Sequence, residues 1–269
     1  MPKAKAFTLI ELLVVIAIIS LLLAILIPTL RQVGRQARAV VCQSNERQWG
    51  LAFAAYASDN DGKLYVWRPG TASDRFLGPP ASYWQDCNDL FLCPMAAKTS
   101  RVGWEPETSV FSTGSTFLPW EINQSIIRGI SSYGLSGFLE VRGSQDDDCC
   151  WHNCLVTNAS AVPVLLDSRQ WVGSPHPSSP PPEYEDGPPV ELSWGVEQRS
   201  SGYMWPFVID RHDGGLNCLF LDWSVRKIGL KELWTLKWHR QYDTAGKWTK
   251  AGGVKPEDWP QWMRKFKDY

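Results

Sequence analysis

One apolar run near the N-terminus limits what this chain can fold into. Residues 7–30 contain a single charged side chain, Glu11. As a helix the run would be about 36 Å long, enough to cross the roughly 30 Å hydrocarbon core of a bilayer. Lys3 and Lys5 precede it, which predicts a cytoplasmic N-terminus. The rest of the chain is then expected on the far side of the membrane.

A cleaved secretory signal peptide is the main alternative for this run. It requires small residues at an A-x-A-like site just beyond the apolar segment. The run instead ends Leu-Ile-Pro-Thr-Leu-Arg at residues 26–31, and the nearest match, at residues 37–39, lies too far downstream. A plain signal anchor does not explain Glu11, because a carboxylate inside an apolar membrane helix costs on the order of 2.5–3.5 kcal/mol. We expect Glu11 to be paired with a cation in the same membrane layer.

Residues 5–15, KAFTLIELLVV, resemble the class III signal of type IV pilins and type II secretion pseudopilins. The resemblance implies that a prepilin peptidase cuts between Ala6 and Phe7, that Phe7 is then N-methylated, and that Glu11 guides subunit docking during assembly. Pro28 matches a helix-loosening proline found near this point in the family. The family normally has glycine before the cut. Ala6 is the smallest replacement, so we expect processing to survive.

Beyond residue 30 the pattern becomes that of an amphipathic helix. One face is predicted from residues that recur at spacings of three, four and seven, namely Val33, Ala37, Val40, Ser44, Leu51 and Ala55. The sequence Asp-Asn-Asp-Gly at 59–62 is a stop signal. The predicted organisation is a leader at 1–6, a transmembrane helix at 7–30, its amphipathic continuation at 31–60 and a globular extracytoplasmic domain at 61–269.

The body is predicted to hold short strands and large loops. Residues 133–139 and 162–167 read as strands, and residues 217–222 and 224–228 alternate on both sides of a tight turn, which predicts an antiparallel hairpin. The proline-rich residues 175–189 predict an exposed loop. The expected fold class is therefore α+β, with a long N-terminal helix packed on an antiparallel-sheet, pilin-like domain. Two short helical patterns are expected after residue 231.

His212 and Asp222 frame the first strand of the hairpin. Their spacing resembles the H-x9-DG element of pseudopilin-like proteins, except that Trp223 stands in place of the glycine. Tryptophan tolerates a positive φ poorly, which argues against a type I′ turn there. His212 also lies between Asp210 and Asp213, which allows a catalytic interpretation or a structural hydrogen-bonding one. No nucleophile elbow, zinc-protease motif or phosphate loop accompanies it, so we expect no enzymatic activity.

Seven cysteines in a body outside the cytoplasm suggest disulfides, with one thiol left over. Cys42 and Cys93 look like a pair found in related sequences, and a bridge between them would pin the body to the helix. One or two further bridges are open among Cys87, Cys149, Cys150 and Cys154, and connectivity cannot be read from sequence. Cys218, inside a predicted strand, is expected to be a buried free thiol.

Two segments in the middle of the chain offer side chains of the kinds that bind metal ions. Residues 149–154, CCWHNC, crowd three thiols and an imidazole together, but adjacent cysteines seldom ligate one ion and no second half-site follows. Asp146, Asp147 and Asp148 offer a calcium site, although a solvated acidic loop is the commoner explanation. No cofactor is expected from the sequence, with calcium left open.

The pattern as a whole predicts a structural subunit of a type IV pilus-like or type II secretion pseudopilus filament. Its expected partners are copies of itself, a prepilin peptidase, an assembly platform and the inner membrane. The near-neutral, slightly acidic body argues against nucleic acid. The alternative is a tip pilin or surface adhesin that binds glycans or particles through the tryptophan-rich body, although core and interface packing is the commoner use of so many tryptophans.

Overall fold

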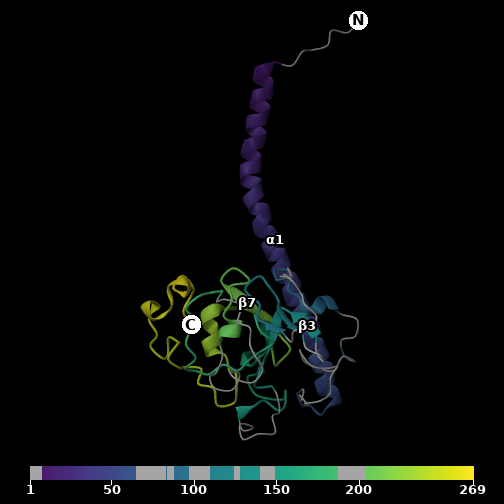
Figure 1. Cartoon of the computed structure of the whole chain (residues 1–269), viewed down its shortest axis with the longest axis vertical. Coiled ribbons are helices and arrows are strands. Elements are labelled where there is room, and N and C mark those ends of the chain that lie inside the picture. The colour runs from purple at the N-terminus through teal and green to yellow at the C-terminus, as the bar shows by residue number, and fades with distance from the viewer. Residues whose placement is uncertain are drawn as a thin grey trace.

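A single long helix leads into a body built of β-sheets and short 3-10 helices (Figure 1). The computed structural model describes residues 8–64, 83, 88–96, 110–123, 128–139, 149–186 and 204–269. The elements in chain order, with η for 3-10 helices, are α1 (Leu9–Asp59), η2 (Asn88–Phe91), β1 (Val110–Ser112), β2 (Trp120–Asn123), β3 (Arg128–Ser131), β4 (Tyr133–Ser136), η4 (Ala159–Ala161), β5 (Pro163–Asp167), β6 (Val172–Gly173), η5 (Trp205–Phe207), β7 (Gly215–Phe220), β8 (Val225–Gly229), η6 (Leu230–Thr235), η7 (Pro256–Asp258) and η8 (Gln261–Met263).

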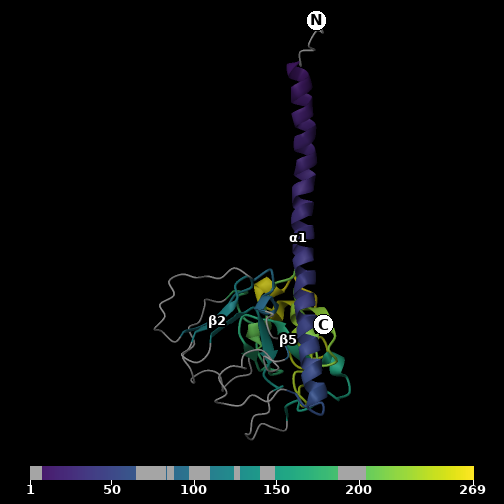
Figure 2. The ribbon, with the colours of Figure 1, turned by 90° about the vertical axis from the view of Figure 1, so that its right-hand side faces the viewer.

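Helix α1 confirms the predicted continuous N-terminal helix, and it passes without a break through Pro28. It ends where the sequence predicts a stop. Asp61 and Gly62 have φ of 55° and 76°, a backbone conformation that ends helices, and the Gly62 N–H donates to the Ala57 carbonyl at 2.7 Å. The helix therefore carries the chain from the N-terminus to the far side of the body in one element (Figure 2).

The face by which α1 packs on the body differs from the predicted one. Val33, Ala37, Val40, Ser44, Leu51 and Ala55 are all exposed. The buried face consists of Cys42, Asn45, Glu46, Trp49, Gly50, Ala52, Phe53 and Ala57. The prediction was wrong because it rested on the more regular apolar repeat. The body instead covers a neighbouring face of the helix, which carries polar side chains.

Two sheets build the body. The larger has the order β6-β4-β5-β7-β8, in which the neighbours are antiparallel except for the parallel pair β4–β6. A second, three-stranded antiparallel sheet has the order β1-β2-β3. The α+β class and the strands predicted around residues 133–139 and 162–167 are thereby confirmed, with β4 ending earlier than expected.

Strand β7 lies at the centre of the packing. Leu219 belongs to the core under α1, whereas Leu216 and Phe220 belong to a second core covered by the C-terminal segment. Gly50 permits the close approach of α1, since a Cβ there would lie 2.9 Å from the Leu219 Cδ1. Both faces of this strand are buried, so the body has a core on each side of the larger sheet.

The β7–β8 hairpin is confirmed, and its turn is unusual. Trp223 has φ of 65° and Asp222 does not share a positive φ, so the turn is not type I′. The Asp222 carboxylate accepts the Ser224 N–H at 3.0 Å and closes the turn. The Trp223 ring stacks on Phe53 of α1 at a centroid distance of 6.1 Å. This contact holds a bulky residue in a conformation that costs about 1–2 kcal/mol.

The C-terminal segment is held by tryptophans rather than by α-helices. The helical patterns expected after residue 231 are short 3-10 turns, η6 to η8. The predicted proline-rich loop is less free than expected, because Ser179 is buried and its carbonyl accepts the Trp234 Nε1–H at 2.9 Å. The Trp262 Nε1–H likewise donates to the Pro182 carbonyl at 3.0 Å.

Candidate functional site

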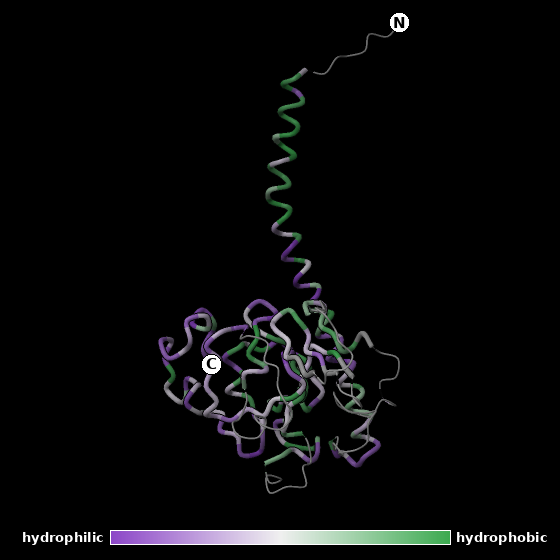
Figure 3. The backbone as a smooth tube through the Cα atoms, in the orientation of Figure 1, coloured by the Kyte–Doolittle hydropathy of each residue, from purple (hydrophilic) through white to green (hydrophobic). Residues whose placement is uncertain are grey.

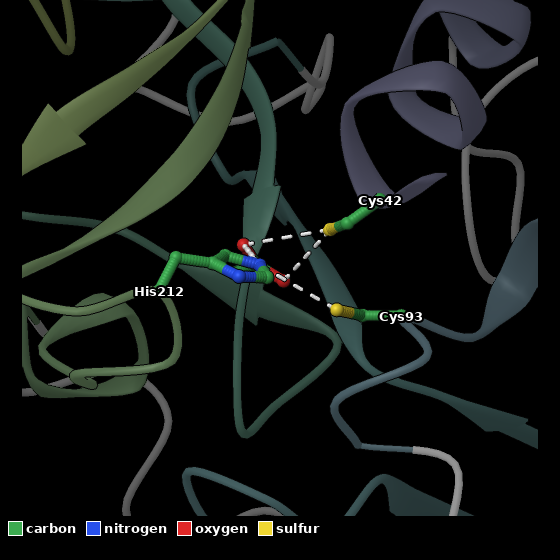
Figure 4. A group of neighbouring side chains, drawn as sticks. Cys42, Cys93 and His212 are labelled. Carbon is green, nitrogen blue, oxygen red and sulfur yellow. Dashed lines mark hydrogen bonds and ion pairs between the residues drawn. The ribbon is translucent and has the colours of Figure 1, made fainter. Parts of the chain in front are cut away.

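A buried polar cluster lies where α1 crosses the larger sheet. Cys42 comes from α1, Cys93 from the loop after η2, Asp167 from the end of β5 and His212 from the loop before β7. All four side chains are buried, and their ligand atoms lie within 4.8 Å of one another. In Figure 4 the labelled Cys42, Cys93 and His212 converge on one point from three separate parts of the chain.

Asp167 is the centre of this cluster. Its Oδ1 lies 3.0 Å from the Arg211 Nη1, and its Oδ2 lies 3.1 Å from the His212 Nε2 and accepts the Asn217 N–H at 2.9 Å. Burial alone would raise the pKa of Asp167, but the charges of His212 and Arg211 hold it well below its usual range. Asp167 is therefore ionised and paired, as a fully buried carboxylate must be.

The two thiols flank this carboxylate. The Cys42 Sγ lies 3.5 Å from Asp167 Oδ1 and accepts the Tyr133 hydroxyl at 3.2 Å, whereas the Cys93 Sγ lies 3.5 Å from the His212 Nε2. Burial, the hydrogen bond to Cys93 and the charge of Asp167 raise the pKa of Cys42 well above its usual value. Burial also opposes ionisation of Cys93, yet hydrogen bonds with Cys42 and His212 lower its pKa to about 6.

His212 contacts both Asp167 and Cys93 through its Nε2. Burial would lower the pKa of His212, but the charge of Asp167 and the hydrogen bond to it raise that pKa to about 9. The His212 Nδ1 is buried and has no hydrogen-bond partner among the described residues. The ring contacts Asp167 and Cys93 rather than the carboxylates of Asp210 or Asp213, whose place beside it in sequence suggested the catalytic interpretation.

Glu46 is a further buried carboxyl next to the cluster. It lies one turn after Cys42 on the same face of α1 and is completely buried. Neither of its oxygens has a hydrogen-bond partner among the described residues. Burial, with the charge of Asp167 second, raises the pKa of Glu46 well above its usual value. The carboxyl is therefore expected to be protonated and uncharged.

Arg211 completes the electrostatics. Its guanidinium is fully buried and donates to Asp167, to the Thr116 carbonyl at 2.7 Å and to the Ser115 carbonyl at 3.1 Å. The cluster thus joins α1, the end of β5, the loop between β1 and β2 and the loop before β7 through buried side chains. Such an arrangement can hold a metal ion, form a bridge between two sulfurs or act purely as a structural network.

The cysteines predicted to form disulfides do not all lie near one another. Cys42, Cys93, Cys149, Cys150 and Cys154 are free thiols in this structure. Cys42 and Cys93 are brought together, although a disulfide requires sulfurs about 2.05 Å apart. Their bridge remains a prediction. Cys218 is a buried thiol of β7, and Cys87 lies outside the described residues.

The other predicted sites contribute little to this cluster. Cys149, Cys150, His152 and Cys154 do not gather their ligand atoms into a metal-binding group in the described part of the chain. Asp146 to Asp148, the calcium candidates, lie outside that part. Asp222 is exposed at the hairpin tip, at the opposite end of β7 from His212. The His212–Asp222 spacing therefore marks the two ends of one strand rather than one site.

At the other end of the molecule, Glu11 begins the helix. Thr8 is the N-cap, and its side-chain oxygen accepts the Glu11 N–H at 3.3 Å, while the Thr8 N–H donates to the Glu11 Oε2 at 2.8 Å. This reciprocal pair is a capping box, and its signature, Thr-x-x-Glu at residues 8–11, can be read directly from the sequence. Ala6 and Phe7 lie outside the described residues.

The outer half of α1 is apolar on every side and uncovered. Leu12, Ile16 and Leu23 are exposed, as are their apolar neighbours along the run. Figure 3 shows this apolar stretch separated from the body by a hydrophilic one. Within the described residues, α1 is the helix whose length and composition allow it to cross a bilayer. An isolated helix of this kind requires lipid or protein around it.

Comparison of the chain with known protein families agrees with this geometry. Residues 1–27 match the prokaryotic N-terminal methylation motif. The chain carries a prepilin-type signal. This signal belongs to type IV pilins and pseudopilins, which are structural proteins, and it accounts for the membrane-anchoring helix. No curated protein and no solved structure matches the chain.

Proposed function

We propose that this protein is a structural subunit of a type IV pilus-like or type II secretion pseudopilus filament. In this proposal a prepilin peptidase cuts before Phe7 and methylates it, an assembly platform extracts the anchored subunit from the inner membrane, and copies of the chain pack through α1. The N-terminus is cytoplasmic before cleavage and the body is periplasmic, and the final filament is periplasmic or extracellular. The role is non-enzymatic.

The uncovered apolar surface of α1 is the observation that supports this proposal best. It is not confined to the membrane-length half, because the inner half also leaves an apolar stripe facing away from the body. Leu51 is 71% exposed and Val40 is 64% exposed, although both lie beyond the apolar run. A helix that only anchored a monomer would not need this stripe, whereas neighbouring helices in a filament would cover it.

The tryptophans favour the filament over the adhesin alternative. Trp49, Trp120, Trp234, Trp238 and Trp259 are almost completely buried. None of the tryptophans within the described ranges is exposed, so they offer no aromatic platform there. They stabilise the body, chiefly around β7 and the C-terminal segment.

Variants of Glu11 test the proposed assembly. A filament needs the negative charge of Glu11 to pair with the methylated amine of a neighbour, whereas an isolated helix needs only its capping oxygen. Glu11→Gln keeps an amide oxygen able to cap the helix and removes the charge. We expect Glu11→Gln and Glu11→Ala to be processed and to remain in the membrane but to yield few or no filaments in sheared fractions.

Thr8→Val is the matched control, because it removes the cap and keeps the charge. It should lower helix stability by about 1 kcal/mol and leave filaments in the sheared fraction. Normal filament yield from Glu11→Gln would contradict the proposed charge pairing. Loss of filaments from Thr8→Val alone would show that the capping box, not the charge, is what assembly requires.

A further inference from the structure

The four-residue cluster under α1 has the donor set of a transition-metal site. Two thiols, one imidazole and one carboxylate offer one ligand atom each, from four segments that are distant in sequence. We propose that Cys42, Cys93, Asp167 and His212 bind a single Zn²⁺ ion that fastens α1 to the body. This site is independent of the proposed filament role, since it lies inside one subunit.

The distances suit a tetrahedral ion. With typical zinc–ligand bond lengths, the edges of a tetrahedral Cys₂HisAsp site are about 3.3–3.8 Å. The separations here are 3.7 Å from Cys42 Sγ to Asp167 Oδ2, 3.1 Å from Asp167 Oδ2 to His212 Nε2, and 3.5 Å from His212 Nε2 to Cys93 Sγ. The other pairs lie within 4.8 Å. The side chains would therefore need only small movements to share an ion.

The surroundings orient two of the four ligands, Asp167 and Cys42. With Oδ2 of Asp167 on the metal, Oδ1 keeps its contact with Arg211 at 3.0 Å, which orients the carboxylate. The Tyr133 hydroxyl donates to the Cys42 Sγ at 3.2 Å, as is appropriate for a thiolate ligand. All of these groups are buried, so water does not compete for the fourth position.

The charges balance when the ion is present. Zn²⁺ with two thiolates and one carboxylate carries a net charge of −1, and the buried Arg211 guanidinium cancels it. The ion binds Cys42 and Cys93 as thiolates and His212 as a neutral imidazole, so the protons that these sulfurs and the His212 Nε2 carry are released to solvent, and no electron transfer is involved. A neutral, fully liganded site of this kind avoids an unpaired charge in the core.

Two thiolates with imidazole and carboxylate in a tetrahedral, closed arrangement select zinc over magnesium or calcium. A zinc site and a Cys42–Cys93 disulfide exclude each other, because a bridged sulfur pair has no thiolate to donate. The two outcomes are therefore distinguishable in the same preparation.

The test uses the full-length chain solubilised in detergent, with thiols blocked at lysis. We expect about one zinc per chain by elemental mass spectrometry, lost in both Cys42→Ser and Cys93→Ser. Cys154→Ser is the matched control, since this half-buried thiol lies outside the group, and it should keep the metal. Cobalt(II) exchanged into the wild-type chain should show thiolate charge-transfer and tetrahedral d–d absorption.

Thiol protection gives a readout that does not depend on the variants folding. In the wild-type chain, Cys42 and Cys93 should become reactive toward an alkylating agent only after a chelator is added. A Cys42–Cys93 disulfide peptide in the blocked preparation would overturn the proposal. So would reduced protein that takes up neither zinc nor cobalt in stoichiometric amount, or zinc that persists in both serine variants.

Discussion

The two halves of helix α1 contrast in what they bury. The outer half is almost entirely apolar, and no described part of the body covers it, whereas the inner half buries Cys42, Asn45 and Glu46 against the sheet. A water-soluble helix would have the opposite distribution. The outer half is therefore suited to lipid and neighbouring helices, and the inner half to a polar network of its own body. One helix serves two environments, and each half should respond to different substitutions.

The largest effect on folding is expected from the polar network beneath the inner half. Arg211→Met leaves the fully buried Asp167 without its guanidinium partner and should lower the free energy of unfolding by about 3–5 kcal/mol. Denaturant unfolding of the full-length chain in detergent, followed by tryptophan fluorescence, measures this loss.

Arg35→Met is the control for that measurement. Arg35 also pairs with a carboxylate, Asp213, but at 3.8 Å and with 52% of its side chain exposed. Its loss should cost less than about 1 kcal/mol. Equal losses in the two variants would show that burial of the network does not matter for stability.

An intermediate effect is expected where the inner half meets the hairpin. Phe53→Leu keeps an apolar side chain of similar size and removes the ring stacked on Trp223. We expect a loss of about 1 kcal/mol in the free energy of unfolding, because an aromatic pair contributes about 0.5–1.5 kcal/mol beyond its area. An unchanged unfolding midpoint would indicate that Trp223 is held in its left-handed conformation by the turn alone.

The smallest effect on folding is expected from the exposed stripe. Leu51→Ala should change the free energy of unfolding by no more than about 0.5 kcal/mol, because the side chain is 71% exposed. The same variant should reduce the yield of sheared filaments, since the stripe is proposed to be covered only in the assembly. An unchanged filament yield from Leu51→Ala would show that the stripe is not part of the interface between subunits.

The elements of the fold that local pattern controls were predictable from sequence. The apolar run with Glu11, the stop after residue 58 and the β7–β8 hairpin each depend on neighbouring residues, and each was located correctly. The buried face of α1 was not, because the choice between two stripes depends on which one the sheet covers. The sequence shows Leu51 and Ala55 in the more regular repeat, while the body packs on the other.

Some residues of the buried cluster were predictable from the sequence, but their association was not. The resemblance paired Cys42 with Cys93, and His212 was singled out from its neighbours, but nothing local joins these residues. Asp167 closes a predicted strand and Arg211 precedes His212, and their partnership depends on strand order in the larger sheet. Their shared burial could not be read from spacing, since the segments are far apart in sequence.

The identity of the mature N-terminus tests the central claim most directly. Mass spectrometry of the chain isolated from membranes or sheared filaments should find Phe7 as the first residue, carrying an N-methyl group, with Glu11 then the fifth residue of the mature chain. An intact Met1, or a chain that begins beyond the apolar run as a secretory signal peptide would leave it, would contradict the account.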